Sequence, residues 1–353
     1  MGATDGGRDR RDWIAATPVS PGVALVVPAH RPGSDLTACL AALSACEPPP
    51  DEFVVVVDGG DPEVVADVVA TVTGPLADRV VTVPIEASGP ATARNVGVAS
   101  TSSEIVLFVD SDVVVRPDIV DSVRAALADP DVDAIIGSYD DRAATATTVS
   151  QFRNLLHHWT HQRSAGPGHT FWGACGAIRR PAFEAVGGFD ESYRDATIED
   201  IELGERLTRA GFHIEVVPSV QVTHLKTWTL TGMIHTDVTK RGIPWTRLML
   251  ADGAMSDDLN ATRAARFTVA LAGVLSALVL SLPVGRGRGM RAGAAVAAAA
   301  ALTWRDRAVL GFLRRVRSTS FAMRSVPLLW IHHVSSGVAF AWAVATWPLV
   351  RRR

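Results

Sequence analysis

Short apolar runs alternate with segments of helical spacing over the first 140 residues of the sequence. The apolar runs occupy residues 23–28, 53–57, 79–83, 105–109 and 134–136. Runs of this length are typical of buried strands. Helical spacing is found at residues 34–46, 62–72, 89–99 and 117–127. Strands that alternate with helices predict an α/β fold with a mostly parallel sheet and helices on both faces.

Carboxylates follow two of the predicted strands directly. Asp58 ends the second run, and Asp110 and Asp112 end the fourth in IVLFVDSDVVV. Ligands of open α/β sheets bind beyond the carboxyl ends of the strands, so these acids are expected on one rim. Paired acids repel unless protons or a cation intervene, and oxygen ligands suit Mg²⁺ or Mn²⁺. A metal site and a surface turn with solvated acids both stay open from this pattern alone.

The pattern changes after residue 140. We predict a helix at residues 149–163, a Gly-rich loop at 166–176, a helix at 199–210, a strand at 213–224 and an amphipathic stretch at 228–250. The first of these helices carries His157, His158 and His161. Their spacing could bind a metal, but no nearby acid completes a site. A polar helix face is therefore the favoured interpretation.

The C-terminal part of the chain is apolar and basic. Residues 261–353 hold fourteen Arg and one acid, a net charge of +13, which leaves −16 for the remaining residues. Uncharged runs cover residues 267–282, 292–304 and 326–350. A membrane span needs about 20 residues, so the last run qualifies and the other two are marginal. An acidic head with such a tail indicates an anionic membrane surface and argues against nucleic acid as a partner. Three spans and a shallow hairpin with an interfacial helix both remain open.

The ends of the chain and its cysteines complete the predicted organisation. Residues 1–20 are polar without an apolar run, so we expect a disordered segment and no secretory signal. A domain is predicted at residues 21–255, and a membrane region at residues 256–353. Three cysteines are too few for a disulfide framework and fit a reducing compartment.

Four stretches, taken in order, resemble an inverting, family 2-type glycosyltransferase with a GT-A fold. They are VVPAHRP, VVVVDGGDP, GPATARNVG before IVLFVDSDV, and GGFDE followed by IEDIELGERLTRAGF. The resemblance covers about residues 22–225, and the tail resembles that of membrane-associated members. It implies metal-dependent transfer of a hexose, with inversion, from a nucleotide-diphosphate sugar. The implied acceptor is lipid-linked or membrane-proximal, and the implied location is the cytoplasmic face of the cell membrane.

The resemblance also implies a donor site. Its residues would be Pro28, His30, Asp58, Arg94, Asn95, Asp110, Trp172 and Gly173. Asp58 would contact the nucleotide base, with Pro28 and His30 lining that pocket. Arg94 and Asn95 would lie near the ribose or the diphosphate. Many relatives carry two adjacent acids after the second strand, whereas here Val57 precedes the single Asp58.

The metal ion, Mg²⁺ or Mn²⁺, would be held by three residues according to the resemblance. They are Asp110, Asp112 and His224. The glycines of FWGACG let backbone approach a ligand, and Trp172 can stack on a sugar face, which makes this segment a candidate sugar-binding loop. A tight turn before a core strand is the alternative for the same segment.

Glu199 and Asp200 begin a predicted helix, where backbone N–H groups favour an ionised carboxylate. Inverting transfer needs one base to deprotonate the acceptor hydroxyl. Hydrolases, in contrast, use a carboxyl pair. The resemblance implies that Asp200 is the base and that Glu199 assists acceptor binding or orients the loop. Ordinary enrichment of acids at a helix N-terminus is the alternative.

Two other functions stay open. A nucleotidyltransferase can use a similar sheet and acidic metal site, but it would normally carry a Gly-rich, basic phosphate loop after the first strand. The sequence has PAHRPG there. A non-catalytic sugar-nucleotide-binding membrane protein is the second alternative, and the intact acids argue against it.

Overall fold

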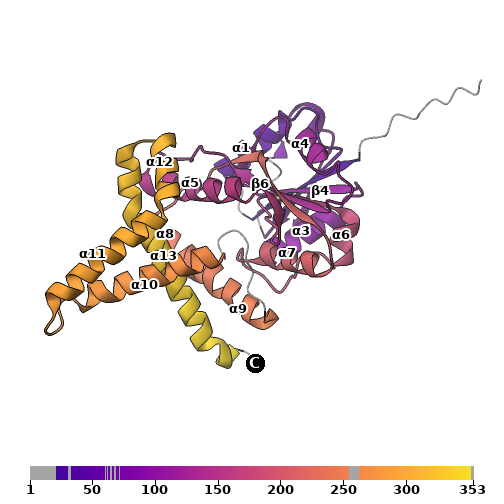
Figure 1. Ribbon diagram of the computed structural model, residues 1–353. Helices are drawn as coiled ribbons and strands as arrows, with labels where there is room; N and C mark the ends of the chain where they lie inside the picture. The colour runs from indigo at the N-terminus through magenta and orange to yellow at the C-terminus, as the bar shows by residue number, and fades with distance from the viewer. Residues whose placement is uncertain are drawn as a thin grey trace, which may run out of the picture.

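The computed structural model describes residues 21–350 except 31–32, 60, 62, 64–65, 67–68, 71 and 254–261. A mixed sheet covered by helices forms one part of the molecule, and the C-terminal helices form the other (Figure 1). The segment predicted at residues 1–20 lies outside the described residues, as does much of the helix predicted at 62–72.

The sheet contains nine strands among the described residues. They are β1 (Val23–Ala29), β2 (Glu52–Asp58), β3 (Val80–Ile85), β4 (Ile105–Val109), β5 (Val113–Val115), β6 (Ala134–Tyr139), β7 (Gly166–Gly168), β8 (Cys175–Arg179) and β9 (Ile214–His224). The helices of this part are α1 (Ser34–Ser44), the short turn η1 (Gly74–Leu76), α3 (Pro90–Ala99), α4 (Ile119–Ala126), α5 (Thr148–Arg163), α6 (Arg180–Ala185) and α7 (Glu199–Arg209).

The strand order is β3-β2-β1-β4-β8-β6-β9-β5, and β7 pairs with β9. Strands β3, β2, β1 and β4 are parallel, as is the pair β6 and β9. Strands β5, β7 and β8 pair antiparallel with their neighbours. The α/β class is as expected, but the parallel arrangement is limited mainly to the first four strands. β5 follows β4 after only residues 110–112, but it pairs with β9 and not with β4.

The first four strands explain why the acids lie at a rim. Every residue of β4 is buried, and so are all but the first residue of β2. Strands covered on both faces must be continuously apolar, so polar residues can appear only where such a strand ends. Asp58 is the last residue of β2, and Asp110 directly follows β4. Both therefore lie at the carboxyl edge of the sheet.

The second part of the molecule begins before residue 256. Its elements are α8 (Leu230–His235), the π-helix η2 (Thr236–Gly242), α9 (Ile243–Asp252), α10 (Arg263–Ser281), α11 (Arg288–Arg305), α12 (Arg307–Val316) and α13 (Thr319–Val350). Helices α10 and α11 form a hairpin that points away from the sheet (Figure 1). Because α8, η2 and α9 pack on α13, we group residues 230–252 with the C-terminal helices.

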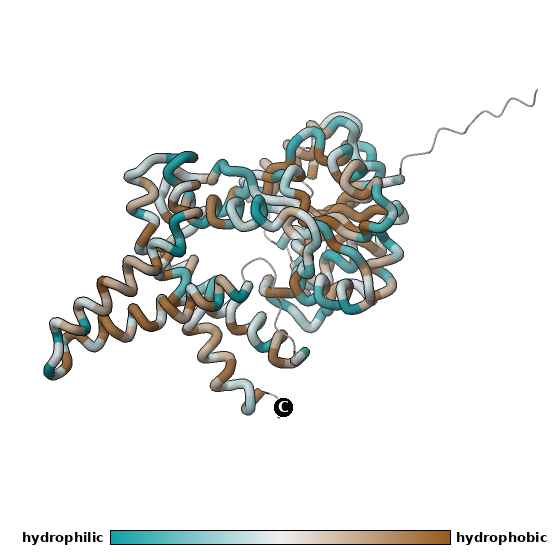
Figure 2. Tube along the Cα trace, in the orientation of Figure 1, coloured by the Kyte–Doolittle hydropathy of each residue, from teal (hydrophilic) through white to brown (hydrophobic). Residues whose placement is uncertain are grey.

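Two of these helices, α10 and α13, are long and apolar enough to cross a membrane, judged by length and composition alone. Figure 2 shows hydrophobic residues along both of them, outside the buried sheet. The run at 267–282, marginal by its own length, becomes a 19-residue helix because residues 263–266 join it. The run at 326–350 lies within the 32-residue α13.

Helix α5 connects the two parts of the molecule. It packs on β6 and also contacts α12 and α13, where Phe152 and Leu155 join an apolar cluster. His161 is 3% exposed and donates from Nδ1 to the Gly137 carbonyl at 2.9 Å. His157 lies 5.2 Å from Tyr139, ring to ring. The histidines predicted to form a polar helix face are therefore partly covered by tertiary packing.

Candidate active site

Two adjoining cavities lie at the carboxyl edge of the sheet. The first, which we call the rim cavity, has a volume of about 370 Å³. The second, the central cavity, has a volume of about 220 Å³. Arg94, Asp110, Asp112 and Ala196 line both of them. The acids predicted at the strand ends therefore face a common space rather than separate surfaces.

Arg94 connects the strand edge to α7. This side chain of α3 is 4% exposed. Its Nη2 donates to Asp110 Oδ1 at 2.7 Å, and its Nη1 donates to Glu199 Oε1 at 3.0 Å. Glu199 is itself buried and accepts from the Thr197 N–H at 2.8 Å. Arg94 and Glu199 thus hold each other in place. Their contacts favour a role in positioning Asp110 and the start of α7.

Two glycines bring α7 close to this arginine. A Cβ on Gly204 would lie 2.1 Å from the Phe171 nitrogen, so only glycine lets α7 approach that loop. A Cβ on Gly173 would lie 2.8 Å from the Arg94 guanidinium carbon. The Gly173 N–H also donates to Asp200 Oδ2 at 3.2 Å. The predicted sugar-binding loop therefore holds the start of α7 through its backbone.

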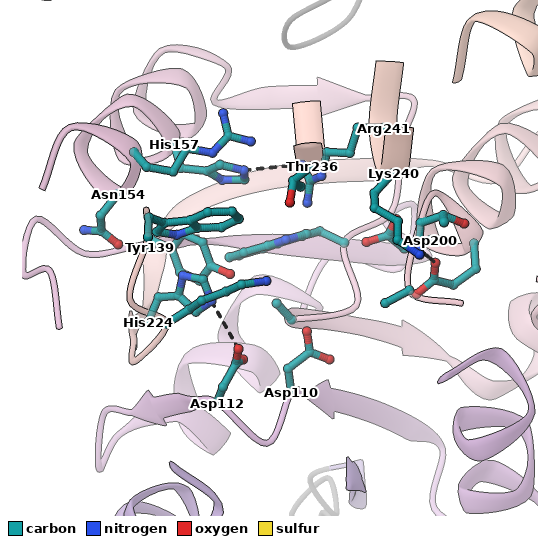
Figure 3. Close-up of a pocket in the computed structure, with 18 of the residues that line it drawn as sticks. Asp110, Asp112, Tyr139, Asn154, His157, Asp200, His224, Thr236, Lys240 and Arg241 are labelled. Carbon is teal, nitrogen blue, oxygen red and sulfur yellow. Dashed lines mark hydrogen bonds and ion pairs between the residues drawn. The ribbon is translucent and has the colours of Figure 1, made fainter. Parts of the chain in front are cut away.

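Asp200 faces the central cavity from the first turn of α7 (Figure 3). Burial, with the Glu199 charge beside it, raises the pKa of Asp200 to about 6. Arg241, Arg94 and the hydrogen bond from Gly173 oppose that rise. No ion pair engages Asp200 in the described part of the chain. Its carboxylate is thus ionised at neutral pH and can still accept a proton.

Asp112 is brought to His224 by the antiparallel register of β5 and β9, in which Val113 faces His224. His224 Nε2 lies 3.4 Å from Asp112 Oδ2 (Figure 3). Burial raises the pKa of Asp112, but the His224 hydrogen bond and the charges of His224 and Lys226 outweigh it and lower the pKa overall. Tyr139 stacks on the His224 ring at 4.4 Å, which fixes the orientation of the imidazole.

The rim cavity is lined by Pro28, His30 and Asp58 at the ends of β1 and β2. Asp58 is buried and accepts from the N–H groups of Ser88 and Gly89, at 2.6 Å and 3.0 Å. It therefore positions the loop before α3 as well as facing the cavity. His30 Nδ1 donates to the Asp58 carbonyl at 2.8 Å.

Asn95 and Gly173 are the predicted donor residues that line neither cavity. The side-chain nitrogen of Asn95 donates to the Phe189 carbonyl, and its oxygen accepts from the Phe189 N–H, both at 2.9 Å. It also donates to Glu191. Because α3 turns this side chain away from Arg94, Asn95 fixes the loop before α7. Trp172, in contrast, lines the central cavity and packs edge-on against Tyr139 at 4.7 Å.

Comparison with known proteins now identifies the family. The family described as Glycosyltransferase like family 2 matches residues 21–237, more than half of the chain. The chain belongs to this family. The match confirms the expected family, the glycosyltransferase class of enzyme and the GT-A fold.

Individual relatives are similar over shorter stretches. An N-acetylglucosaminyl-diphospho-decaprenol L-rhamnosyltransferase of Mycobacterium tuberculosis (strain ATCC 25618 / H37Rv) is 50% identical over 54 residues, 15% of this chain and 17% of that protein. An N-acetylglucosaminyltransferase of Rhizobium meliloti (strain 1021) is 25% identical over 259 residues, 68% of this chain and 59% of that protein. The chain thus spans less than two thirds of these relatives. A mannosyltransferase from Pyrobaculum calidifontis, solved with GDP-Man and Mn²⁺, aligns at 18% identity and a TM-score of 0.49, covering 92% of this chain and 88% of that one.

The acids at the sheet edge are the candidate ligands of a divalent ion. Within the described residues, no group of three His, Cys, Asp or Glu side chains could hold a metal ion. Mg²⁺, however, is usually held by one or two carboxylates together with substrate phosphates and waters. Asp112 meets that requirement, because its side chain is 35% exposed, faces both cavities and has no arginine partner. Asp112 therefore fits as a protein ligand of a divalent ion that binds together with the phosphates of a substrate.

The sequence did not single out several residues of the central cavity. They include Tyr139, Arg153, Asn154, Thr236 and Lys240. Tyr139 ends β6, so the rule that polar residues mark strand ends could have found it. The others come from α5 and η2, which meet the sheet only through tertiary packing, and no local pattern indicates that contact.

Proposed function

We propose that this family 2 protein transfers a hexose from a nucleotide-diphosphate sugar to an acceptor hydroxyl at a membrane, with inversion and with the help of Mg²⁺ or Mn²⁺. The carrying observation is that two adjoining cavities share Asp110 and Asp112, while Asp200 lines one of them and Pro28 and Asp58 line the other. A donor in the rim cavity and an acceptor in the central cavity would meet at Asp110 and Asp112.

The chemistry follows from which groups face that space. The acceptor oxygen forms a bond to the anomeric carbon while the bond from that carbon to the diphosphate oxygen breaks. The nucleoside diphosphate leaves with the electron pair, and the acceptor proton passes to Asp200. A base poised near neutrality suits this step. No second carboxylic acid is needed, because a diphosphate leaves without being protonated.

Three further groups of residues would prepare the reaction. Asp112, with His224 beside it and Asp110 as a neighbour, would hold the divalent ion, which when bound neutralises charge on the leaving diphosphate. Arg94 and Glu199 keep Asp110 and Asp200 at a fixed separation through their ion pair. Asp58 and His30 would contact the nucleotide end of the donor.

A membrane acceptor is supported by the second part of the molecule. Two helices are long and apolar enough for a span, and residues 261–353 carry a charge of +13. Clusters of arginine next to apolar helices are attracted to anionic lipid at the cytoplasmic leaflet. The name of the rhamnosyltransferase relative describes a decaprenol-linked acceptor for that protein. We therefore propose the cytoplasmic face of the cell membrane as the place of action.

The test uses the full chain in detergent with a panel of nucleotide sugars and Mn²⁺, measuring release of the nucleoside diphosphate. Asp200→Asn should lower turnover by about 10²- to 10⁴-fold, the usual contribution of a general base. It should keep the thermal stabilisation that donor binding produces. Asp112→Asn should lose both turnover and the Mn²⁺-dependent part of that stabilisation.

The matched control is Asp121→Asn, an exposed acid at the start of α4, which should change neither quantity. Full turnover in Asp200→Asn would contradict the proposed base. Release of pyrophosphate from a nucleoside triphosphate, with no turnover of any nucleotide sugar, would favour the nucleotidyltransferase instead.

A further inference from the structure

A third cavity opens from the central cavity toward the C-terminal helices. Its volume is about 610 Å³, and it lies between α5, η2, α9, α10 and α13. Apolar side chains such as Met249, Val269 and Phe340 line it. We call it the apolar cavity. Arg153, His157 and Arg241 line both this space and the central cavity, so the two spaces meet at these residues.

The junction holds buried polar atoms without partners. Arg153 and Asn154 are 6% and 4% exposed, yet Nε of Arg153 and Oδ1 of Asn154 make no hydrogen bond. Nδ1 of His157 is likewise buried and unpartnered. An unsatisfied buried polar atom costs about 1–3 kcal/mol. Nε of Arg153 and Nδ1 of His157 lie where the two cavities meet and indicate a polar ligand group at that point, whereas Oδ1 of Asn154 faces the central cavity alone.

The charge of the junction indicates an anion. Arg241 contacts His157 at 3.4 Å but makes no ion pair with a carboxylate in the described ranges. Arg153, in contrast, is neutralised by Asp237 at 2.7 Å, and Asp237 is also bound by His332 of α13. Lys226 adds a second cation to the wall of the central cavity, and its Nζ lies over the Trp228 ring at 4.5 Å. The carboxylates of Asp200 and Asp112 line the central cavity with these cations and offset part of their charge, so Arg241, which faces both cavities, is the cation available to an anion at the junction.

The three spaces are arranged as an amphipathic molecule would require. Asp200 and Arg241 face the central cavity (Figure 3). Arg241 also faces the apolar cavity, which α10 and α13 line as well. Those two helices are the ones that could cross a membrane. A hydrocarbon chain gains about 0.8 kcal/mol for each CH₂ group removed from water.

We propose that the apolar cavity binds the single hydrocarbon chain of a lipid-linked acceptor, and that the phosphate joining this chain to the acceptor's hydroxyl-bearing group sits at Arg241 and the unpartnered Nε of Arg153. The inference rests on the proposed function, since it names the acceptor for that transfer. A two-chain membrane phospholipid is not the occupant, because the phosphate lies inside the enzyme, next to the catalytic cavity.

The binding test uses a hexadecyl phosphate that carries a photoreactive diazirine in its chain, with the full-length protein in nanodiscs. Cross-links should map to α9, α10 and α13. A Cβ on Gly273 meets nothing within 4 Å, and Gly273 lines the cavity, so Gly273→Leu adds a side chain to the cavity wall at an open position. Cross-linking should fall at least about tenfold in this variant, as expected when binding space is removed.

The matched control is Gly293→Leu. Gly293 also lies in an apolar helix with nothing within 4 Å of a Cβ, but on α11 and outside the cavity. Its cross-linking should equal that of the unchanged protein. Arg241→Gln should weaken hexadecyl phosphate by about tenfold, the usual effect of losing a hydrogen bond to a charged group. The same change should leave a hexadecanol probe unaffected.

Two results would overturn the inference. One is equal labelling of Gly273→Leu and the unchanged protein; the other is displacement of the probe by an equimolar two-chain phospholipid when the labelling is repeated in detergent. Failure of the proposed function is separable from these, because nucleotide-sugar turnover is measured independently of labelling. Where transfer is observed, Gly273→Leu should raise KM for a long-chain acceptor and leave a short-chain, water-soluble acceptor unchanged.

Discussion

At the scale of single residues, the site depends on a buried arginine between two carboxylates. Arg94 contacts both Asp110 and Glu199, one at the sheet edge and one on α7. Its side chain also packs 5.3 Å from the Phe189 ring centre. A buried ion pair of this kind does little for stability by itself, but breaking it leaves charges buried without a partner.

Arg94→Met should therefore destabilise the protein by about 3–5 kcal/mol, the usual cost of removing one partner from a buried pair. Denaturant unfolding followed by tryptophan fluorescence would measure it. Arg116→Met is the control, because the Arg116–Asp118 pair is exposed and should be worth less than about 1 kcal/mol. Equal losses in the two variants would contradict the account of Arg94.

Asp200 makes a prediction about pH. Its pKa is raised to about 6, so the carboxyl is protonated below that pH and ionised above it. Only the ionised form can take the acceptor proton. kcat/KM should thus be level above about pH 7 and fall about tenfold per unit below about pH 6. Residual activity of Asp200→Asn should lack this limb, and an unchanged profile would assign the limb to another group.

At the scale of elements, the sequence predicts what its local patterns encode. The strands ending at Ala29, Asp58 and Val109 are apolar runs with polar ends, so both the strands and their terminal acids were predictable. Strands β5 and β7 were not, because three residues form a strand only through the neighbours that they pair with, and β8 was expected only under the alternative of a turn before a core strand. Packing of α5 and η2 likewise hid Asn154 and Lys240, whose approach to the site no local pattern indicates.

Helix α7 illustrates how one element determines the geometry of the site. Its Gly204 determines how close Asp200 comes to Gly173. Gly204→Ala should force the Phe171 backbone to move, costing about 1–3 kcal/mol and lowering transfer more than donor binding. Gly293→Ala on α11 has open space and should instead gain up to about 1 kcal/mol from helix propensity. Melting temperatures and turnover of the two variants would check this, and equal effects would refute it.

At the scale of the whole molecule, the two parts are joined by polar contacts as well as by apolar packing. Asp237 of η2 binds Arg153 of α5 at 2.7 Å and His332 of α13 at 2.8 Å. Helices α5 and α13 also contribute to one apolar cluster, through Phe152, Phe321 and Leu329 among others. The C-terminal helices are thus part of the wall around the catalytic space.

Membrane attachment through these helices predicts a defined extraction behaviour. Screening by salt weakens attraction between arginine and anionic lipid, but it does not release an inserted apolar helix. The full chain, expressed in bacteria, should stay in the membrane pellet after a wash with 1 M NaCl, a condition with a Debye length of about 3 Å. It should dissolve in mild detergent. Release by salt alone would show that α10 and α13 do not insert.

The position of α13 in the chain has a consequence for biosynthesis. Residues 319–350 are the last described element to leave the ribosome, yet they supply His332 and one side of the apolar cavity. The two cavities at the sheet edge are lined by residues between 28 and 241, so they can assemble before α13 leaves the ribosome. The apolar cavity is complete only once α13 has emerged, so under the proposed function a nascent chain could load its donor before it can hold a long-chain acceptor.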